Sequence, residues 1–195
     1  FCALFVSVDS IKEYVQGPSG QAMFITSIIF QFVIMFVLIC TNLHRRKPHN
    51  LVLLSLFTIF LSYTLGVTSS YYDTKVLLYA GGLTFIVTIG LTLFAFQTKY
   101  DFTGAGPYLL SLLLVLIFMG IMKKFIKNDI YNIIYSAIGA LIFSFYIIFD
   151  TQLIIGGKHK YQFDEEDYVF AALSLYLDII NLFLFILQLW EKSLL

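Results

Sequence analysis

The sequence predicts an all-α, polytopic membrane protein, and three observations support this fold class. Of the 195 residues, 59% are apolar and only 12% are charged, whereas soluble domains average about 45 to 50% apolar and about 25% charged residues. Six apolar runs follow one another along the chain, each about the 20 residues that a helix needs to cross a bilayer. The polar joints between them are too short to hold a further domain. Residues 1–195 are therefore predicted to form a single transmembrane domain.

The six complete spans are bounded by charged residues, glycine or proline. They cover approximately residues 22–43, 51–70, 76–96, 105–122, 130–155 and 168–190. Residues 1–8 are also apolar, but this stretch ends at Asp9 and does not begin with an initiator methionine. A signal peptide would need a basic segment before the apolar run, whereas Lys12 and Glu13 follow it. We interpret residues 1–8 as the end of a truncated first span and expect seven spans in the parent protein.

Charge and residue usage exclude several classes of function. Twelve Lys and Arg residues balance twelve Asp and Glu residues, so there is no basic field to bind nucleic acid or an anionic membrane surface. The expected partner is the lipid bilayer, because the six apolar runs are long enough to span it. Cys2 and Cys40 are too few for a disulfide framework or a Cys-based zinc site. His44, His49 and His159 lie in polar joints without metal-ligand spacing and are interpreted as surface residues. We expect no cofactor and no enzymatic activity.

Two ionisable residues fall deep inside predicted spans, where a charge is costly unless it is paired or hydrated. Asp150 lies six residues before Gly156 ends its run, and Asp178 lies ten residues past Tyr168. At 1.5 Å per residue these positions are about 9 Å and about 15 Å from the same side, because the joint between them makes the two helices antiparallel. The two carboxyl groups are therefore expected to share one site.

A pair of close carboxylates has a distinct chemistry. Both cannot ionise at low cost, so the pair is expected to hold one shared proton over some pH range. Loss of this proton would drive the helices apart or let a cation replace it, and calcium prefers such hard oxygen ligands. Asp150 and Asp178 are thus predicted to sense pH and to bind calcium transiently. The alternative is that both acids hydrogen-bond to buried partners and hold the helices in register.

Polar residues continue along one face of the last span. Ser174 lies four residues before Asp178, and Asn181 lies three residues after it. This spacing places all three on one side of a helix, facing protein or water instead of lipid. Tight packing around the last helix is the simpler explanation of this polar stripe.

Two charged joints flank these spans. Four acids, residues 164–167, precede the last span, where the helix dipole favours negative charge. Helix capping accounts for most of these acids. Glu166 is the candidate for an acid that attracts cations to the mouth of a path toward Asp178. Arg45 and Arg46 follow the first complete span. They are interpreted either as solvated or lipid-headgroup residues or as a latch that pairs with Asp150 in a closed state.

Longer motifs resemble a known family. The segments FDTQL (149–153) and DEEDYVFAALSLYLDIINLFL (164–184) are similar to the C-terminal signature of the transmembrane Bax inhibitor motif-containing family. The segments PHNL (48–51), YDT (72–74) and FAFQTKYDF (94–102) resemble its lifeguard and Golgi anti-apoptotic protein branch. The resemblance extends over essentially the whole chain.

The resemblance implies a seven-helix Bax inhibitor-like bundle with the last helix central and the first helix truncated here. It implies a calcium leak across a Golgi or endoplasmic reticulum membrane, suppression of apoptosis, and apoptosis-regulating membrane proteins as partners. It also implies that Asp150 and Asp178 sense pH and gate the leak, and that an acid at Glu166 contributes to conduction. The resemblance also implies that an arginine acts as a latch, but it does not decide whether this residue is Arg45 or Arg46.

The sequence therefore predicts a pH-regulated calcium leak channel with an inhibitory role in apoptosis. One alternative is a non-conducting membrane adaptor that modulates cell death through protein partners. A second is an intramembrane aspartyl protease, which also needs two aspartates on neighbouring helices. The residues argue against the protease, because residues 175–177 (LYL) precede Asp178 in place of Gly-x-Gly and the last proline of the chain is Pro107.

Overall fold

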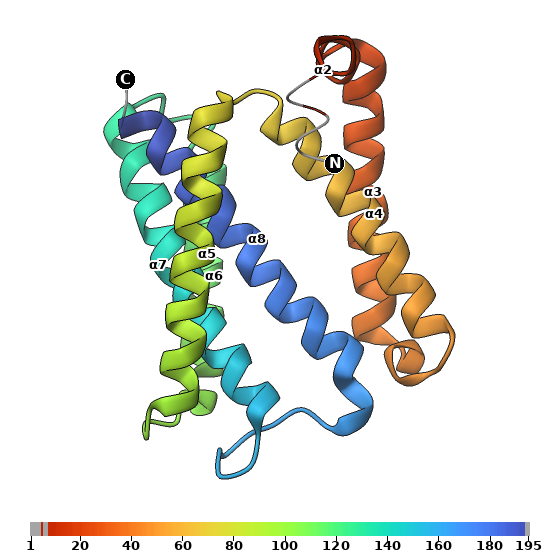
Figure 1. Cartoon of the computed structure of the whole chain (residues 1–195), viewed down its shortest axis with the longest axis vertical. Coiled ribbons are helices and arrows are strands. Elements are labelled where there is room, and N and C mark those ends of the chain that lie inside the picture. Colours follow the sequence, from red (N-terminus) through yellow and green to blue (C-terminus); the bar gives the residue numbers. More distant parts are fainter. Residues whose placement is uncertain (1–4, 6–7, 194–195) are drawn as a thin grey trace. The chain divides into compact units, whose positions relative to one another are not determined.

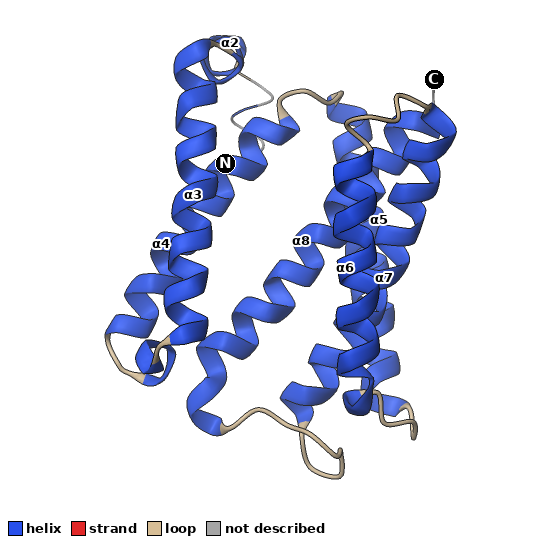
Figure 2. Cartoon of the chain, turned by 180° about the vertical axis from the view of Figure 1, so that it is seen from behind, coloured by secondary structure: helices blue, strands red, loops and turns tan. Residues whose placement is uncertain are grey.

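The computed structural model describes residues 5 and 8–193. These residues form helices joined by loops, with no strand among them (Figure 2). The elements are α2 (Asp9–Gln16), α3 (Pro18–Cys40), η1 (Asn42–Arg45), α4 (His49–Ser69), α5 (Thr74–Gln97), η2 (Thr103–Ala105), α6 (Gly106–Met122), α7 (Asp129–Ile155), η3 (Glu165–Asp167) and α8 (Tyr168–Ser193). Six of the described helices, α3 to α8, are long and apolar enough to cross a membrane. The predicted all-α, polytopic membrane fold is confirmed.

The ends of the helices differ from the predicted spans in a few places. Helix α3 begins earlier, with Pro18 in its first turn, and ends at Cys40 instead of residue 43. It ends there because Thr41 is extended and its hydroxyl accepts a hydrogen bond from Leu43 N, which starts the 3-10 turn η1. The short helix α2 is not predicted from the sequence. The truncated first span expected at residues 1–8 lies outside the described residues, apart from Phe5 and Val8.

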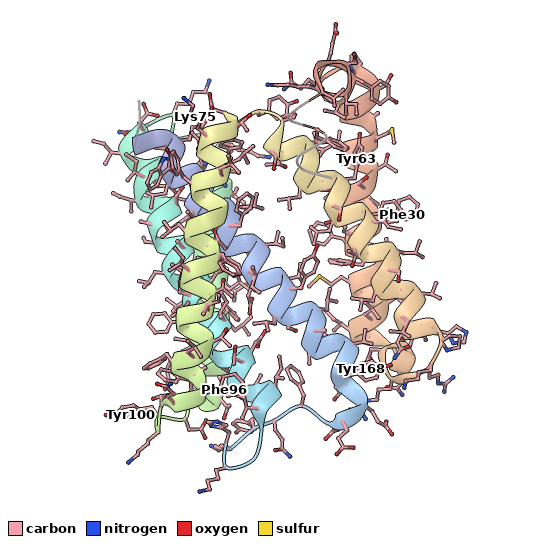
Figure 3. The ribbon with its side chains drawn as sticks, viewed as in Figure 1. Phe30, Tyr63, Lys75, Phe96, Tyr100 and Tyr168 are labelled. Carbon is pink, nitrogen blue, oxygen red and sulfur yellow. The ribbon has the colours of Figure 1, made fainter. Side chains whose placement is uncertain are left out.

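The long helices present large apolar side chains on their surface. Phe32 on α3, Phe85 on α5 and Phe118 on α6 are 70%, 67% and 62% exposed. Phe30 and Phe96, labelled in Figure 3, are likewise exposed. Apolar surface of this extent is typical of helices whose outer faces contact lipid. The protein is a multi-pass membrane protein in contact with the bilayer.

The chain divides into two compact units, residues 1–77 with 166–170 and residues 78–165 with 171–195. In the first unit, α3 and α4 pack side by side (Figure 1). The Gln31 amide donates to Thr64 Oγ1 at 2.6 Å, and the Phe30 ring stacks on Phe60 at 5.1 Å between centroids. The single domain predicted for residues 1–195 is not tested by this division and stays a prediction.

The second unit contains most of α5, all of α6 and α7, and α8 from Ala171 onward. Helix α6 packs on α7, where the Tyr131 hydroxyl donates to the Met119 carbonyl at 2.8 Å. Helix α7 contacts α8 through the stacked rings of Phe143 and Phe185. These two helices carry both predicted intramembrane acids.

Gly156 ends α7 in a conformation that only glycine adopts at low cost. Its φ is +60° and its ψ is −134°, and an added Cβ would lie 2.7 Å from Gln162 Oε1. We expect Gly156→Ala to lower the free energy of unfolding by about 1–3 kcal/mol, the usual cost of a strained backbone residue. The change is measured as an apparent melting temperature in detergent. Gly104→Ala is the control and should cost less, because a Cβ at Gly104 meets open space. Gly157→Ala is less suitable as a control, since Gly157 also has a positive φ.

Candidate functional site

The two intramembrane aspartates lie together in the second unit. Asp150 is near the end of α7 and Asp178 is in α8, and each residue is 6% exposed. Their carboxyl groups interact directly. Asp178 Oδ2 has no hydrogen-bond partner among the described residues. The structure thus brings together the two acids that the sequence predicts to share a site.

This arrangement constrains how the pair can be charged. Two ionised carboxylates so close together in a buried site would repel each other strongly. A single proton held between them removes that repulsion, because a protonated carboxyl group donates a hydrogen bond to its ionised neighbour. The geometry can therefore hold one proton or, in its place, one cation.

Tyr146 is a third member of the site that sequence reasoning missed. It lies one helical turn before Asp150 on α7, and its hydroxyl is within electrostatic range of both Asp150 and Asp178. Its ring contacts Phe149 edge to face at 6.4 Å and Phe143 at 5.8 Å between centroids. The four-residue spacing from Asp150 is the only signal that could have indicated it.

The predicted polar stripe on α8 is partly satisfied by the helix itself. The Asn181 amide donates to the Leu177 carbonyl of the preceding turn at 2.8 Å. Ser174 and Asn181 are both half-buried, one turn on either side of Asp178. Their side chains share a helical face with the acid, and their contribution to an ion path stays a prediction.

Gln152, two residues past Asp150, fixes the end of α7 to a loop of the same unit. It is fully buried, its amide donates to the Tyr100 carbonyl at 2.9 Å, and its Oε1 accepts from Phe102 N at 2.7 Å. A buried glutamine that makes both bonds to one loop sets the position of that loop. In the sequence Gln152 is part of the motif at residues 149–153, which does not indicate this role.

Asp101, between these two loop residues, accepts hydrogen bonds from a second loop as well. Its Oδ1 accepts from Thr103 N at 2.9 Å and from Thr103 Oγ1 at 2.6 Å, and its Oδ2 accepts from Lys160 N at 2.8 Å. His159 Nδ1 lies 3.3 Å from Oδ1. The Thr103 hydroxyl bond, with smaller contributions that include the Lys160 amide, lowers the pKa of Asp101 from 3.8 to about 2.

These bonds predict an acid-sensitive loop contact. A carboxylate whose pKa is lowered by folding stabilises the fold above its unfolded pKa, and this stability is lost as the pH falls through the folded pKa. For Asp101 the window lies between 3.8 and about 2. We expect the parent to melt at a higher temperature than Asp101→Asn at neutral pH, and the difference to shrink as the pH falls through this window. A difference that is independent of pH would contradict the assignment.

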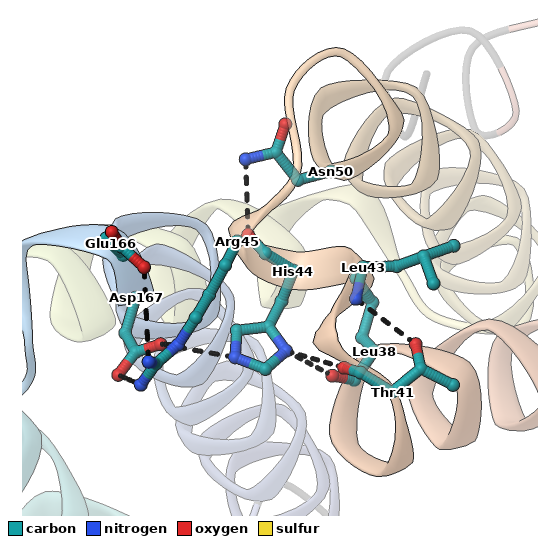
Figure 4. Close-up of polar contacts among 8 residues, drawn as sticks. All are labelled: Leu38, Thr41, Leu43, His44, Arg45, Asn50, Glu166 and Asp167. Atoms are coloured by element: carbon teal, nitrogen blue, oxygen red, sulfur yellow. Dashed lines mark hydrogen bonds and ion pairs between the residues drawn. The ribbon is translucent and has the colours of Figure 1, made fainter.

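A second polar cluster lies in the first unit, between η1 and the start of α8 (Figure 4). Arg45 donates from Nε to Asp167 Oδ1 at 2.7 Å and from Nη2 to Asp167 Oδ2 at 2.8 Å. The Asp167 side chain is only 14% exposed. Glu166 Oε2 lies 4.0 Å from Arg45 Nη1, and its side chain is 74% exposed. We call Arg45, His44 and Asp167 the clasp.

The clasp changes the interpretation of Arg45 and Arg46. The two arginines that the sequence left open are both exposed, but among the described residues only Arg45 has an ion pair with Asp167. The partner is Asp167, for which the sequence predicts only helix capping as one of the four acids at residues 164–167. A closed-state pairing with Asp150 stays a prediction, and Glu166, as the exposed acid beside Arg45, stays the candidate mouth acid.

His44 completes the clasp, and its prediction as a surface residue is wrong. Its side chain is 16% exposed. Nδ1 lies 2.9 Å from the carbonyls of Leu38 and Thr41, and Nε2 lies 3.1 Å from Asp167 Oδ1. The His44 ring thus lies between the end of α3 and the start of α8, with Nδ1 facing the carbonyls and Nε2 facing the carboxylate. His159 is also partly buried against Asp101, whereas His49 is exposed.

Tyr168, at the start of α8, makes two further contacts, one with the first turn of α4 and one with the joint before it. The Asn50 amide donates to the Tyr168 hydroxyl at 2.9 Å and to the His44 carbonyl at 3.1 Å, and Asn50 is fully buried. The Lys47 ammonium lies 5.4 Å from the centre of the Tyr168 ring. Figure 3 labels Tyr168 at this end of α8. The clasp is therefore part of a wider polar contact within the first unit.

These features define a multi-pass helical membrane protein with an acid pair buried in its spans. The chain belongs to the family described as Inhibitor of apoptosis-promoting Bax1 (Bax1-I), which matches residues 1–193. The resemblance to the Bax inhibitor motif family that the sequence motifs indicated is thereby confirmed.

Individual relatives agree with this assignment. Protein lifeguard 3 of Homo sapiens is 34% identical over 191 residues, which cover 96% of this chain and 61% of the relative. Protein lifeguard 3 of Mus musculus is 33% identical with the same coverage. The Golgi anti-apoptotic protein of Vaccinia virus (strain Lister) is 38% identical over 98% of this chain and 77% of its own length. The chain thus spans about three fifths of the length of the lifeguard 3 relatives.

Proposed function

We propose that this chain forms a pH-regulated calcium leak in an intracellular membrane and that this leak inhibits apoptosis. The observation that carries the proposal is the pair of interacting carboxyl groups of Asp150 and Asp178, both buried in helices long enough to cross a membrane. Intramembrane acids are costly, and where they occur they commonly mark proton relays or ion pathways. The same pair serves as pH sensor and as transient cation ligand.

The small number of oxygen ligands at the acid pair supports a calcium ion that passes through the site instead of one that stays bound there. Calcium takes six to eight oxygen ligands at a tight site. Among the described residues no group of three His, Cys, Asp or Glu side chains could hold a metal. Two carboxylates alone bind calcium weakly, and conduction requires binding that is weak enough for the ion to leave.

The location and the cellular role are proposed from a relative. The vaccinia relative is named a Golgi anti-apoptotic protein, which supports a Golgi membrane and an inhibitory role in cell death for this chain. An endoplasmic reticulum location is the alternative. Glu166 is proposed as the acid that attracts cations to the mouth of the path, since its side chain is 74% exposed and it lies in the joint before α8.

Calcium flux through the purified full-length protein in liposomes tests the proposal. We expect flux above that of protein-free liposomes, and a rate that changes between about pH 5 and about pH 8 as the pair exchanges its shared proton. Flux that is absent at every pH, for protein that remains folded in the liposomes, would contradict the channel and favour an adaptor that acts through protein partners.

A further inference from the structure

A cluster of aromatic rings separates two polar regions between α7 and α8. The Phe185 ring stacks on Phe143 at 5.7 Å and contacts Tyr135 edge to face at 5.4 Å between centroids. Phe143 and Phe185 are each 8% exposed. We call Tyr135, Phe143 and Phe185 the aromatic cluster.

The Phe185 ring lies against the backbone of α7 because Gly139 has no side chain. A Cβ added at Gly139 would collide with Cδ1, Cε1 and Cγ of that ring. The space next to Phe185 on α8 is also closed, since Leu182, Ile186 and Leu187 are buried. The contact between the two helices is therefore apolar and tightly packed at this level.

Polar groups lie on both sides of this level. On one side is the acid pair, with Asp178 seven residues before Phe185, or about 10 Å along the helix. On the other side Gln188 accepts a hydrogen bond from Lys123 Nζ at 3.0 Å, and this ammonium lies 5.3 Å from the centre of the Tyr135 ring.

The far polar region continues along α7. Ser136, 1% exposed, has no hydrogen-bond partner for its hydroxyl among the described residues, and the same holds for Asn132 Oδ1. Buried polar groups of this kind are costly in a membrane unless water reaches them. Each side of the aromatic cluster thus carries polar groups that a water-filled path would satisfy.

We propose that Phe185, seated over Gly139 and stacked on Phe143, is a hydrophobic gate in the ion path, between the acid pair and the polar region formed by Ser136, Gln188 and Lys123. The inference rests on the proposed calcium leak and adds the position at which the path is closed. An apolar constriction stops ions by excluding water, and it opens when the ring moves or is removed.

Phe185→Ala tests the gate through calcium flux in liposomes. It should raise the flux severalfold over that of the parent. Phe145→Ala, which removes the same side chain from a position on α7 that is 41% exposed, should leave the flux unchanged. If Phe185→Ala does not fold, Phe185→Leu keeps an apolar side chain without the ring and should give a smaller increase.

Thiol labelling provides a second measurement that does not depend on calcium. In a background with Cys2→Ser and Cys40→Ser, a charged, membrane-impermeant methanethiosulfonate is added separately from each side of vesicles. Gln188→Cys and Asn181→Cys should react from opposite sides, because Phe185 lies between them. Adding Phe185→Ala should let each of them react from both sides.

The two measurements separate the gate from the channel. If the parent conducts calcium but Phe185→Ala behaves like Phe145→Ala in flux and labelling, the gate is overturned and the leak stands. If Phe185→Ala lets both cysteines react from both sides of the vesicles while no variant conducts calcium, the gate stands and the calcium leak is overturned. If Gln188→Cys and Asn181→Cys already react from the same side in the parent background, Phe185 is not the barrier.

Discussion

Asp178→Asn should remove most of the pH dependence of calcium flux while leaving the protein folded. The carboxyl groups of Asp150 and Asp178 are buried and interact, so in the proposed channel a proton shared between them is expected to set the balance between closed and open states. A gating balance that shifts by about 1.4 kcal/mol changes the open fraction of a mostly closed channel about tenfold. Asparagine has nearly the same shape and cannot ionise, so the flux of the variant should vary little across the pH range.

Three further variants make this result specific to the pair. Asp150→Asn should have the same effect, and the double variant should add little to either single one, because residues in contact are coupled. Glu13→Gln removes one exposed acid from α2 and should retain the pH dependence of the parent. A pH dependence that survives in both single variants would contradict the role of the pair, even if the protein conducts calcium.

Breaking the clasp should lower stability by a measurable amount. Arg45 donates two hydrogen bonds to a carboxylate that is 14% exposed, while its own side chain is 38% exposed. Bidentate charge-assisted pairs are stronger than ordinary surface pairs, and partial exposure reduces the gain. We therefore expect Arg45→Gln to lower the free energy of unfolding by about 1–2 kcal/mol, measured by unfolding in detergent.

The neighbouring arginine provides the matched control for the clasp. Arg46→Gln removes the same charge one residue later from an exposed side chain, and should change stability by less than about 0.5 kcal/mol. Asp167→Asn should cost about as much as Arg45→Gln, and the double variant should cost less than the sum of the two. Equal effects of Arg45→Gln and Arg46→Gln would show that the loss is one of local charge and not of the clasp.

The position of the acid pair was predictable from the sequence, because helical geometry alone sets the depth of a residue in a span. Asp150 and Asp178 lie on successive antiparallel helices at similar distances from the joint between them, and the structure brings their carboxyl groups together. Tyr146 was not predictable in the same way. Its only signal is the four-residue spacing from Asp150, which has no clear meaning among many aromatic residues until the helix that faces Tyr146 is known.

The partner of Arg45, in contrast to the position of the acid pair, was not predictable from the sequence. The basic joint and the acidic joint are both plain in the sequence, but more than a hundred residues separate Arg45 from Asp167. Charge alone made Asp150, Glu166 and Asp167 equally acceptable partners. The choice of Asp167 depends on the 3-10 turn η1, which begins where Thr41 ends α3 and carries both His44 and Arg45.

The sequence by itself determined the fold class and the six long spans, because apolar length and helical periodicity are properties of each segment alone. Its motifs at residues 149–153 and 164–184 indicated the family by resemblance. It also determined that two acids lie at a depth where charge is costly. Only the tertiary structure decided that Arg45 pairs with Asp167, that Gln152 and Asp101 hold two loops together, and that Phe185 packs over Gly139. These contacts join residues distant in the chain, and packing between helices, not the preference of any one segment, selects them.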